Sequence, residues 1–540
     1  MSTECYPITV LPHISRLYGE YLAMSDGAKD APVRRWYGAE PIGGRWAGKA
    51  VTVPNAERLA DALESQNIEF GAGAAAMANI ARLRAGARAV VTGQQVGLFG
   101  GPLLTLLKAS TAVARAKQAQ KATGVDHVPI FWLATEDHDL AEVDHVSLPG
   151  KFGVETLRAK LKPPVVAPVG GVALGNEIEA VLEQASELLG YAPICDLLRE
   201  CYVPREGYAP TLGGAFARLM ARVFADEGLI VIDAAGREFH ALGERTLRYA
   251  IEHADELHEA LVARTAELEG GGFHAQVMVA NGSSLLFLVD ESGARLALKR
   301  LPNDGWKAGR QMYTTAELLA ILEAAPERIS PNALLRPVFQ DTILPTAAYI
   351  GGPSEIAYFA QSAVLYEAIL GHITPVLPRF SATLIEPAIG VVMDRHEVQL
   401  PDVMTTAEEL AQRLGARAMP IAGKRKLAAV GNAMDAELTA LTEYLGEMDA
   451  SLGKSAEISG NKMRYQMNRL RRMSASFEVQ KEASLRKHAD ALTLNLFPNA
   501  HPQERLLGGV WFLSQFGEGL IARLVHEAEN LCPGHIVVRL

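Results

Sequence analysis

The first 140 residues contain two apolar runs separated by a segment with helical periodicity. The first run ends at Thr92, and a leucine-rich helical pattern then extends from Pro102 to about Gln120. The second run, residues 128–134, shows almost no alternation with polar residues, which is typical of a parallel strand covered on both faces. Because a helix joins two parallel strands with a right-handed crossover, we expect both strands to end at the same edge of one sheet.

Further helix–strand pairs follow along the chain, at residues 211–235 and 353–378. The segments between these pairs have other patterns of apolar and polar residues. Residues 151–200 are mixed, and residues 275–300 predict a β-hairpin with a turn at Glu291–Gly293. The pattern therefore predicts an α/β protein whose open parallel sheet is interrupted by insertions and then resumed.

After about residue 400 the apolar residues adopt a different spacing. They recur at intervals of three and four, first at Leu438, Leu441, Leu445, Met448 and Leu452 and then less regularly at Met463, Met467, Leu470 and Phe477. Such spacing with charged flanks indicates a coiled coil. We expect Gly453 and Gly460 to break it into an antiparallel helical hairpin. An amphipathic helix packed on the main domain is the alternative.

Composition narrows the classes of function. The 540-residue chain has a net charge of −10, which argues against a nucleic-acid-binding surface. Its basic runs at residues 423–426 and 464–472 are typical of solvated helix faces. The four cysteines are too few and too scattered for a disulfide framework, and the sequence has no C-x-x-C zinc pair. No secretory leader or membrane-spanning stretch is evident, so we expect a cytoplasmic protein that binds neither nucleic acid nor membrane.

The loop after the first strand, from Gly93 to Gly101, contains four glycines and two glutamines. Its spacing matches neither the dinucleotide-binding fingerprint nor the P-loop. Glycines still let a backbone approach a ligand, and the helix that follows would offer free N–H groups to an anion. A polar stripe along that helix would face a ligand or water: Thr105, Lys108, Thr111 and Arg115. Spacing alone leaves open both an anion or nucleotide site and a tight structural turn.

The second strand ends in a dense polar cluster, Thr135 to Asp139, with further carboxylates and His145 close behind. Open α/β sheets bind ligands beyond the carboxyl ends of their strands, so this cluster and the glycine loop are expected to share one crevice. His138, beside two carboxylates, is a candidate general base. The same cluster could instead coordinate Mg²⁺ or Zn²⁺, but no second set of spaced ligands is apparent and we predict no metal site.

A third polar group follows in the region 332–381. Polar side chains interrupt an apolar run, a glycine pair with Pro353 begins a helix, and an arginine and a serine follow the next strand: Arg336, Gln340, Asp341, Arg379 and Ser381. The helix N-terminus is another candidate anion site. An arginine at such a sheet edge suits a carboxylate or a phosphate.

Several long blocks of the sequence resemble one protein family. They are TGQQVGLFGGPLLTLLK, PIFWLATEDHDLAEVDHV, LRPVFQDTILPTAAYIGGPSEIAYFAQ, PRFSATL and FPNAHPQER. The blocks are similar, in the same order, to those of the cysteine ligases of bacillithiol biosynthesis, the BshC family. The resemblance implies a ligase of the last step in that pathway, which joins L-cysteine through an amide bond to the amine of glucosaminyl-malate.

The resemblance also implies a fold. It is a Rossmann-like parallel-sheet core with connecting-peptide insertions, plus a C-terminal α-helical coiled coil that serves homodimerisation. We expect the core in residues 1–150, 206–238 and 329–400, and insertions in residues 151–205 and 239–328, the second with the β-hairpin. A coiled-coil hairpin would occupy residues 401–495, and a C-terminal segment, residues 496–540, would pack back on the core.

The matched blocks supply the candidate site residues. The predicted catalytic residues are Lys108, Asp137 and His138. The predicted substrate-binding residues are Thr92, Gln94, Gln95, Gly97, Gly101, Asp139, Arg336, Gln340, Asp341, Glu355, Arg379 and Ser381. The family's nucleotide site near the C-terminus implies Gln503, Glu504 and Arg505 as nucleotide-binding residues, with ATP or ADP as the candidate cofactor.

The resemblance leaves the activation of cysteine open, because the signatures that class I aminoacyl-tRNA synthetases use for adenylation are absent. Our hypothesis is activation as a phosphate ester or adenylate at the glycine loop. Asp137 or His138 would take a proton from the glucosamine ammonium, and Arg336 or Arg379 would pair with the malate carboxylates. Two other classes remain: a metal-dependent amidohydrolase or deacetylase that uses the Glu136–His138 cluster, and a non-catalytic nucleotide-binding coiled-coil scaffold.

Overall fold

A computed structural model describes residues 4–24, 32–37, 45–48, 51–302, 305–517 and 519–540. The chain divides into two compact units. The larger contains the described residues up to Thr383 together with Glu504–Ile536, and the smaller contains Leu384–Gln503 with Val537–Leu540. Each unit is described separately below.

The centre of the larger unit is a five-stranded sheet in the order β13-β12-β2-β3-β6, in which every neighbouring pair is parallel. Its strands are β2 (Arg88–Gln94), β3 (His127–Leu133), β6 (Ile230–Ile232), β12 (Thr346–Gly351) and β13 (Val376–Pro378). The helices that precede or join them are α4 (Leu104–Thr123), α8 (Leu212–Val223) and α13 (Pro353–Leu370). The predicted α/β fold with an open parallel sheet is therefore confirmed.

The sheet is covered on both faces, as the apolar sequence of β3 predicts. All seven residues of β3 are buried. Most residues of α4 are buried as well, and the helix ends at Gly124, whose left-handed backbone (φ 69°) suits glycine. The helix begins at Leu104, two residues later than predicted, because the chain from Phe99 (φ 51°) to Gly101 (φ 68°) is still in a left-handed turn.

Helices and short sheets surround this core. The N-terminal helices are α1 (Arg16–Ala23), α2 (Ala56–Glu69) and α3 (Ala74–Arg84). After β3 come α5 (Leu140–Val143), the antiparallel pair β4 (His145–Pro149) and β5 (Val154–Arg158), α6 (Glu177–Leu189) and α7 (Ala192–Tyr202).

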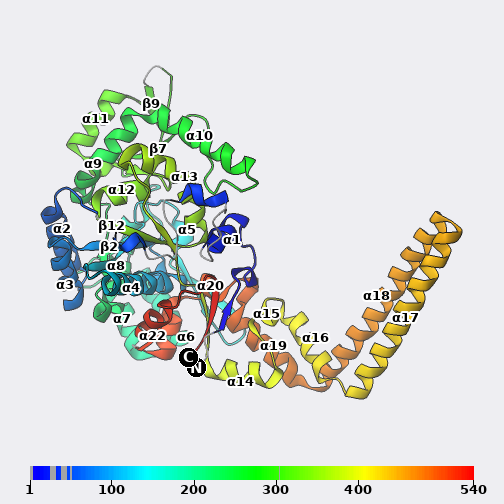
Figure 1. The fold of residues 1–540 in the computed structure, drawn as a ribbon. Coiled ribbons are helices and arrows are strands. Elements are labelled where there is room, and N and C mark those ends of the chain that lie inside the picture. The colour runs from blue at the N-terminus through cyan, green and yellow to red at the C-terminus, as the bar shows by residue number, and fades with distance from the viewer. Residues whose placement is uncertain (1–3, 25–31, 38–44, 49–50, 303–304, 518) are drawn as a thin grey trace. The chain divides into compact units, whose positions relative to one another are not determined.

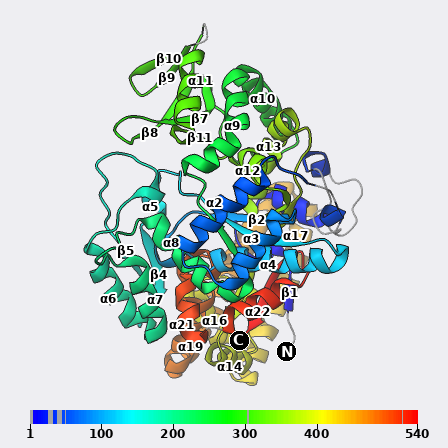
Figure 2. The same ribbon diagram turned by 90° about the vertical axis from the view of Figure 1, so that its left-hand side faces the viewer.

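A second sheet, antiparallel in the order β10-β9-β8-β7-β11, lies in the insertion between β6 and β12. Its strands are β7 (Ser283–Val289), β8 (Arg295–Arg300), β9 (Gly305–Ala308), β10 (Gln311–Thr314) and β11 (Ile329–Pro331). The helices of this insertion are α9 (Arg237–Glu252), α10 (Ala254–Gly270) and α11 (Thr315–Ala324), and α12 (Arg336–Ile343) follows β11. Figure 2 shows β7 to β10 gathered with α10 and α11 at the top of the view. The hairpin predicted in residues 275–300 is confirmed as β7 and β8.

The two ends of the chain meet in a three-stranded sheet of order β1-β15-β14, formed by β1 (Glu4–Tyr6), β14 (Ala382–Ile385) and β15 (His535–Arg539). Helices α20 (Gln503–Leu506), α21 (Gly509–Phe516) and α22 (Gly519–Ala528) precede β15. Cys5, a residue of β1, forms a disulfide with Cys532, with a Cα–Cα distance of 6.1 Å. Cysteine spacing gave no sign of this bond, because the pairing of the first and last strands brings together residues 527 positions apart.

The smaller unit is helical, with α14 (Pro387–His396), α15 (Leu400–Val403), α16 (Ala407–Ala418), α17 (Ile421–Met448), α18 (Ala450–Lys481) and α19 (Ala483–Leu496). Figure 1 shows α17 and α18 side by side as a long hairpin, which confirms the predicted coiled-coil region.

The predicted break in this hairpin is wrong. The chain turns at Asp449, whose carboxylate accepts hydrogen bonds from the backbone N–H groups of Ser451 (2.8 Å) and Leu452 (3.3 Å) and so caps α18. Gly453 and Gly460 both lie inside α18. A Cβ atom at Gly453 would lie 2.8 Å from the Cα of Gly446, so this glycine permits close approach of the two helices.

None of the described helices is both long and apolar enough to span a membrane.

Candidate functional site

A cavity of about 810 Å³ lies in the larger unit beyond the carboxyl ends of the central strands. Residues just after or at the ends of β2, β3, β12 and β13 line it: Gln94, Leu133, Gly352 and Arg379. The glycine loop and the acidic cluster were expected to share one crevice, and the start of the loop (Gln94, Gln95) and the centre of the cluster (residues 136–138) do line this cavity. The two segments meet there because parallel strands joined by helical crossovers end at the same edge of the sheet, as the sequence predicted.

The glycine loop itself is a packed turn. Gly97 and Gly101 approach so closely that a Cβ on Gly97 would lie 2.9 Å from the Cα of Gly101. The segment after Arg505 covers the loop, because Leu103 donates its N–H to Leu507 O (2.8 Å) and Gly509 donates to Gly101 O (3.0 Å). The cavity is lined by what flanks the turn, including Gln94 and Gln95 before it and Lys108 after it.

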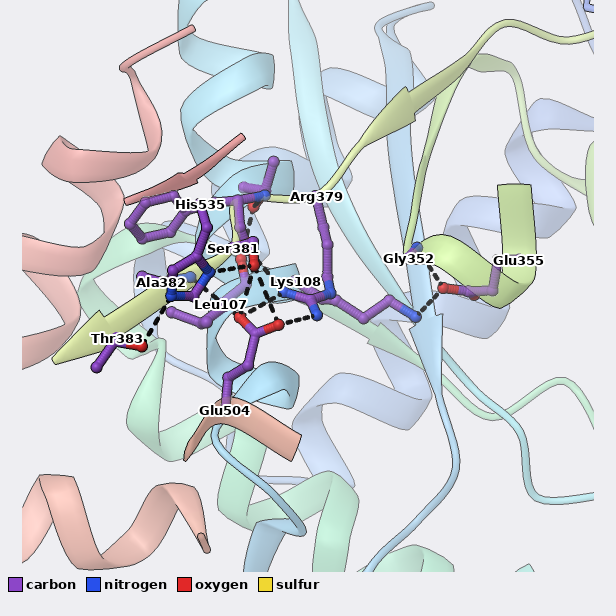
Figure 3. A network of polar contacts seen from close by, with 12 residues as sticks. Leu107, Lys108, Gly352, Glu355, Arg379, Ser381, Ala382, Thr383, Glu504 and His535 are labelled. Atoms are coloured by element: carbon purple, nitrogen blue, oxygen red, sulfur yellow. Dashed lines mark hydrogen bonds and ion pairs between the residues drawn. The ribbon is translucent and has the colours of Figure 1, made fainter. Parts of the chain in front are cut away.

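Three of the four residues of the polar stripe on α4 are buried, and the fourth, Arg115, is half-buried. Thr105 and Thr111 have no exposed surface, and Lys108 is 2% exposed. Lys108 Nζ donates to Glu355 Oε2 (2.5 Å), to Gln94 Oε1 (3.1 Å) and to the backbone oxygen of Gly93. Figure 3 shows Lys108 reaching across to Glu355 at the start of α13. Lys108 thus has an acceptor for each of its three protons.

Glu355 is the carboxylate that balances Lys108. Burial alone would raise the pKa of Glu355, but the charge and hydrogen bond of Lys108, the Tyr349 hydroxyl and the Gly352 N–H outweigh it and lower that pKa. The Tyr349 hydroxyl lies 2.5 Å from Oε1, and the Gly352 nitrogen lies 2.8 Å from Oε2. Burial lowers the pKa of Lys108, and the charge and hydrogen bond of Glu355 oppose that shift. The pair is therefore fixed in place by its hydrogen bonds and by the attraction between the two groups.

Arg336 lies beside this pair and forms no ion pair with a carboxylate among the described residues. Its guanidinium donates to the Tyr358 hydroxyl (3.0 Å) and to Gln340 Oε1 (3.0 Å), and its carbon lies 5.5 Å from the centre of the Tyr349 ring. Burial raises the pKa of Tyr358 to about 12, so this hydroxyl is neutral near pH 7. Arg336 therefore keeps a full positive charge at the cavity wall.

The acidic cluster after β3 forms the facing part of the lining. Asp137 Oδ2 accepts from Gln95 Nε2 (3.0 Å), and the same amide donates to Glu142 Oε2 (2.5 Å). His138 Nδ1 lies 3.0 Å from Nη1 of Arg295, a residue of β8. The Arg295 guanidinium also stacks 3.6 Å from the centre of the Phe287 ring. The β-hairpin of the insertion thus contributes a cation to the cavity.

Glu136, in the same cluster, pairs with a buried histidine of α9. His240 Nε2 lies 2.8 Å from Glu136 Oε1, and the His240 side chain is fully buried while Glu136 is 15% exposed. Burial alone would lower the pKa of His240, but the charge and hydrogen bond of Glu136 outweigh it and raise that pKa. The pair therefore links a buried imidazole of α9 to a carboxylate that lines the cavity.

Arg379 is held by an ion pair from the C-terminal segment (Figure 3). Its Nη1 and Nη2 lie 2.9 Å and 2.5 Å from the two carboxylate oxygens of Glu504, and the side chains are 3% and 1% exposed. Burial would raise the pKa of Glu504, but the Arg379 charge and hydrogen bonds lower it to about 2. His535 bridges Ser381 (2.8 Å) and Thr383 (2.7 Å), and burial lowers its pKa to about 4. Arg379 and Ser381 are thereby committed to internal partners.

The predicted site residues divide into two groups. Those that line the cavity are Gln94, Gln95, Lys108, Asp137, His138, Arg336, Glu355, Arg379 and Arg505. Those that do not are Thr92, Gly97, Gly101, Asp139, Gln340, Asp341, Ser381, Gln503 and Glu504.

Most of the second group support the lining residues or the fold. Thr92 donates to Ile350 O (3.0 Å), Asp139 caps α5, and Asp341 accepts from Gln340 (2.9 Å) and Tyr366 (2.6 Å). Gln503 bonds the backbone of Leu384 within the smaller unit.

Sequence reasoning missed Arg295, Tyr349, Tyr358 and His240. Tyr349 lies inside an apolar strand and Tyr358 inside a largely apolar helix, where an aromatic residue normally indicates core. Arg295 lies on a hairpin 157 residues from its partner His138, and His240 lies 104 residues from Glu136. No local spacing signals such long-range pairs.

The lining does not have the character of a metal site. Across the part of the chain that the structure describes, no group of three or more His, Cys, Asp or Glu side chains is arranged to hold a metal ion. His138 also has a guanidinium on its Nδ1, and this cation would repel a metal ion there.

Comparison with known proteins agrees with this division into sheet core and helical hairpin. The family model of the N-terminal Rossmann-like domain of bacillithiol biosynthesis BshC matches residues 4–380, and that of the C-terminal coiled-coil domain matches residues 382–540. Proteins named "Putative cysteine ligase BshC" from Koribacter versatilis and Solibacter usitatus are 42% and 35% identical, each over 100% of both chains. Another of that name from Chlorobaculum tepidum is 33% identical over 90% of this chain and 89% of its own. The chain therefore belongs to the BshC family, the cysteine ligases of bacillithiol biosynthesis.

Proposed function

We propose that this enzyme forms the amide bond between L-cysteine and the amine of glucosaminyl-malate, the last step of bacillithiol biosynthesis. The observation that carries the proposal is the charge of the cavity. Three of its arginines, Arg295, Arg336 and Arg505, have no carboxylate within 4.0 Å among the described residues, although all three line the same space. Such unneutralised guanidinium groups favour a ligand that carries several carboxylate or phosphate groups.

Glucosaminyl-malate fits this description because its malate part carries two carboxylates. The sequence suggested Arg336 or Arg379 as the residue that binds the malate carboxylates. Arg336 is the stronger candidate, because Arg379 already forms a bidentate ion pair with Glu504. Arg505 is exposed and lines the cavity, and its side chain has no hydrogen bond or ion pair to another side chain among the described residues. It is therefore a candidate for the second carboxylate or for a phosphate. The volume of about 810 Å³ lies within the range of roughly 300–1,000 Å³ typical of small-molecule sites.

Amide formation from a free carboxylate is uphill in water, so cysteine must first be activated. We propose activation as a phosphate ester or adenylate, with ATP as the phosphoryl or nucleotidyl source. Lys108 is fixed by its three acceptors and would act by its charge, while Gln94 and Gln95 would orient the substrate.

We also propose that the enzyme acts as a homodimer joined through the helical hairpin. Large apolar side chains remain exposed along both helices: Ile421, Val430, Leu441, Tyr444, Met448, Leu452, Ile458, Met463, Tyr465, Leu470, Met473 and Phe477. An exposed apolar surface of this extent is typical of an interaction face, and a second copy of the same hairpin offers a matching one.

The function is tested in a bacillithiol-producing bacterium whose own ligase gene is deleted. Expression of this chain is expected to restore bacillithiol and to remove the accumulated glucosaminyl-malate, both measured by thiol labelling and mass spectrometry. The matched control is a variant with Lys108→Met, which removes the central charge of the cavity. Continued accumulation of glucosaminyl-malate in the presence of the folded wild-type chain would refute the proposed function.

A further inference from the structure

Joining an amine to an activated carboxylate needs a group that takes a proton from the ammonium form of the amine. The acidic cluster after β3 contains three candidates, Glu136, Asp137 and His138, and all three line the cavity. Their hydrogen bonds distinguish them, because an atom that already accepts a strong bond is a poor proton acceptor.

Asp137 has both carboxylate oxygens in use. Oδ1 accepts from the backbone N–H of His138 (2.7 Å) and that of Asp139 (3.4 Å), while Oδ2 accepts from Gln95 Nε2 (3.0 Å). These bonds hold the turn after β3 in shape.

His138 has its acceptor nitrogen in use. An arginine carries donors only and stays protonated, so the contact between Arg295 Nη1 and His138 Nδ1 requires the lone pair of Nδ1. The imidazole proton then lies on Nε2, which makes the ring a hydrogen-bond donor toward substrate.

Glu136 differs from both. His240 occupies only Oε1, and Oε2 has no hydrogen-bond partner among the described residues. The side chain is mostly buried, at 15% exposed, yet lines the cavity. Of the two remaining carboxylates of the lining, Glu355 has both oxygens in use, by Lys108, Tyr349 and Gly352. Glu142 accepts from Gln95 through Oε2, and its side chain is exposed to solvent, unlike that of Glu136.

We propose that Glu136 is the catalytic proton acceptor for the amine of glucosaminyl-malate and that His240 is its positioning residue. This inference rests on the proposed function. A proton moves from the glucosamine ammonium to Oε2 of Glu136, and the electron pair of the broken N–H bond stays on nitrogen. That pair forms the C–N bond to the activated cysteinyl carbon while the C–O bond to phosphate or adenylate breaks. The second nitrogen proton leaves with the departing phosphate oxygen.

His240 fits the role of a positioning residue. It is fully buried, is not among the residues that line the cavity, and bonds Oε1 of the cavity-lining Glu136. That bond holds Oε1 and leaves Oε2 without a partner among the described residues, in the manner by which buried partners orient catalytic side chains.

The test compares Glu136→Gln with Glu136→Asp in purified full-length enzyme and in the deletion strain. Glutamine keeps the size of the side chain and an oxygen for His240, but it cannot take the proton. We expect turnover to fall by about 100-fold or more, the usual worth of a general base, while glucosaminyl-malate still binds by calorimetry. Aspartate keeps the carboxylate and is expected to retain measurable turnover. Glu244→Gln, which removes a carboxylate from a half-buried ion pair with Arg248 on the same helix as His240, is the control and should behave as wild type.

A double-variant comparison tests His240. Because His240 acts through the carboxylate, His240→Asn should lower turnover in the wild-type background but cost nothing further in the Glu136→Gln background. Full restoration of bacillithiol by Glu136→Gln would overturn the inference and leave the proposed function standing. Failure of the wild-type chain to restore bacillithiol would overturn both.

Discussion

Glu504→Gln should destabilise the larger unit without changing the shape of any side chain. In the wild type, Glu504 accepts two hydrogen bonds from Arg379, and it also accepts from Ser381 Oγ (3.1 Å) and from the N–H of Ala382 (3.0 Å). The glutamine amide would place N–H donors against the donors of a buried guanidinium. Arg379 would then be a buried cation with no counter-charge.

The size of the effect follows from the pKa of Glu504. Its fall from the ordinary 4.5 to about 2 corresponds to about 3 kcal/mol of unfolding free energy. Loss of one partner from a buried ion pair typically costs roughly 3–5 kcal/mol, which agrees. Because the folded-state pKa is depressed, this contribution is complete above about pH 4.5 and disappears as the pH falls toward about 2.

Urea unfolding followed by tryptophan fluorescence measures the free energy of unfolding of the larger structural unit, in which the Arg379–Glu504 pair lies. All five tryptophans lie in the larger unit, at Trp36, Trp46, Trp132, Trp306 and Trp511. At pH 7 we expect Glu504→Gln to lose about 3 kcal/mol relative to wild type, and the difference should shrink as the pH is lowered below about 4.5. Addition of Arg379→Met to Glu504→Gln should recover part of the loss, since no unpaired charge remains. A loss under about 1 kcal/mol at pH 7, or a loss that does not change with pH, would refute the reasoning.

Three further predictions concern substrate binding, assembly and the disulfide. Arg336→Met should raise the KM for glucosaminyl-malate by roughly 10- to 100-fold, the worth of one charge-assisted hydrogen bond; an unchanged KM in steady-state kinetics would exclude Arg336 from malate binding. Leu441→Glu with Leu470→Glu should convert a dimer to a monomer in analytical ultracentrifugation while circular dichroism stays helical, and a dimer that persists would place the interface elsewhere. Cys5→Ser should lower the unfolding free energy by about 2–4 kcal/mol, and reductant should do the same to wild type; insensitivity of the wild-type urea midpoint to reductant would contradict a stabilising bond to Cys532.

The central sheet could be predicted from sequence because the burial of each strand is recorded in the residues of that strand. A strand buried on both faces, such as β3, must be apolar throughout, and the handedness of the crossover then fixes which edge carries the site. That reasoning correctly brought Gln95, Lys108 and Asp137 to one cavity.

The features that sequence missed depend on partners far along the chain. Arg295 reaches the cavity because an insertion folds back over the sheet edge, and no residue near it in sequence indicates this. The hairpin turn at Asp449 was missed for an energetic reason. A glycine such as Gly453 costs a helix only about 1 kcal/mol, which packing can offset, whereas a capping aspartate gives the new helix partners for its free N–H groups.

The Arg379–Glu504 pair also has a consequence for how the chain is made. The two residues are 125 positions apart, which at a synthesis rate of roughly 5–20 residues per second is an interval of about 6–25 s. During that time Arg379 has no counter-charge and must stay hydrated, so the end of β13 cannot settle into its final buried environment. The cavity is therefore completed only when the last part of the chain has emerged, and a prematurely terminated product would leave it unfinished.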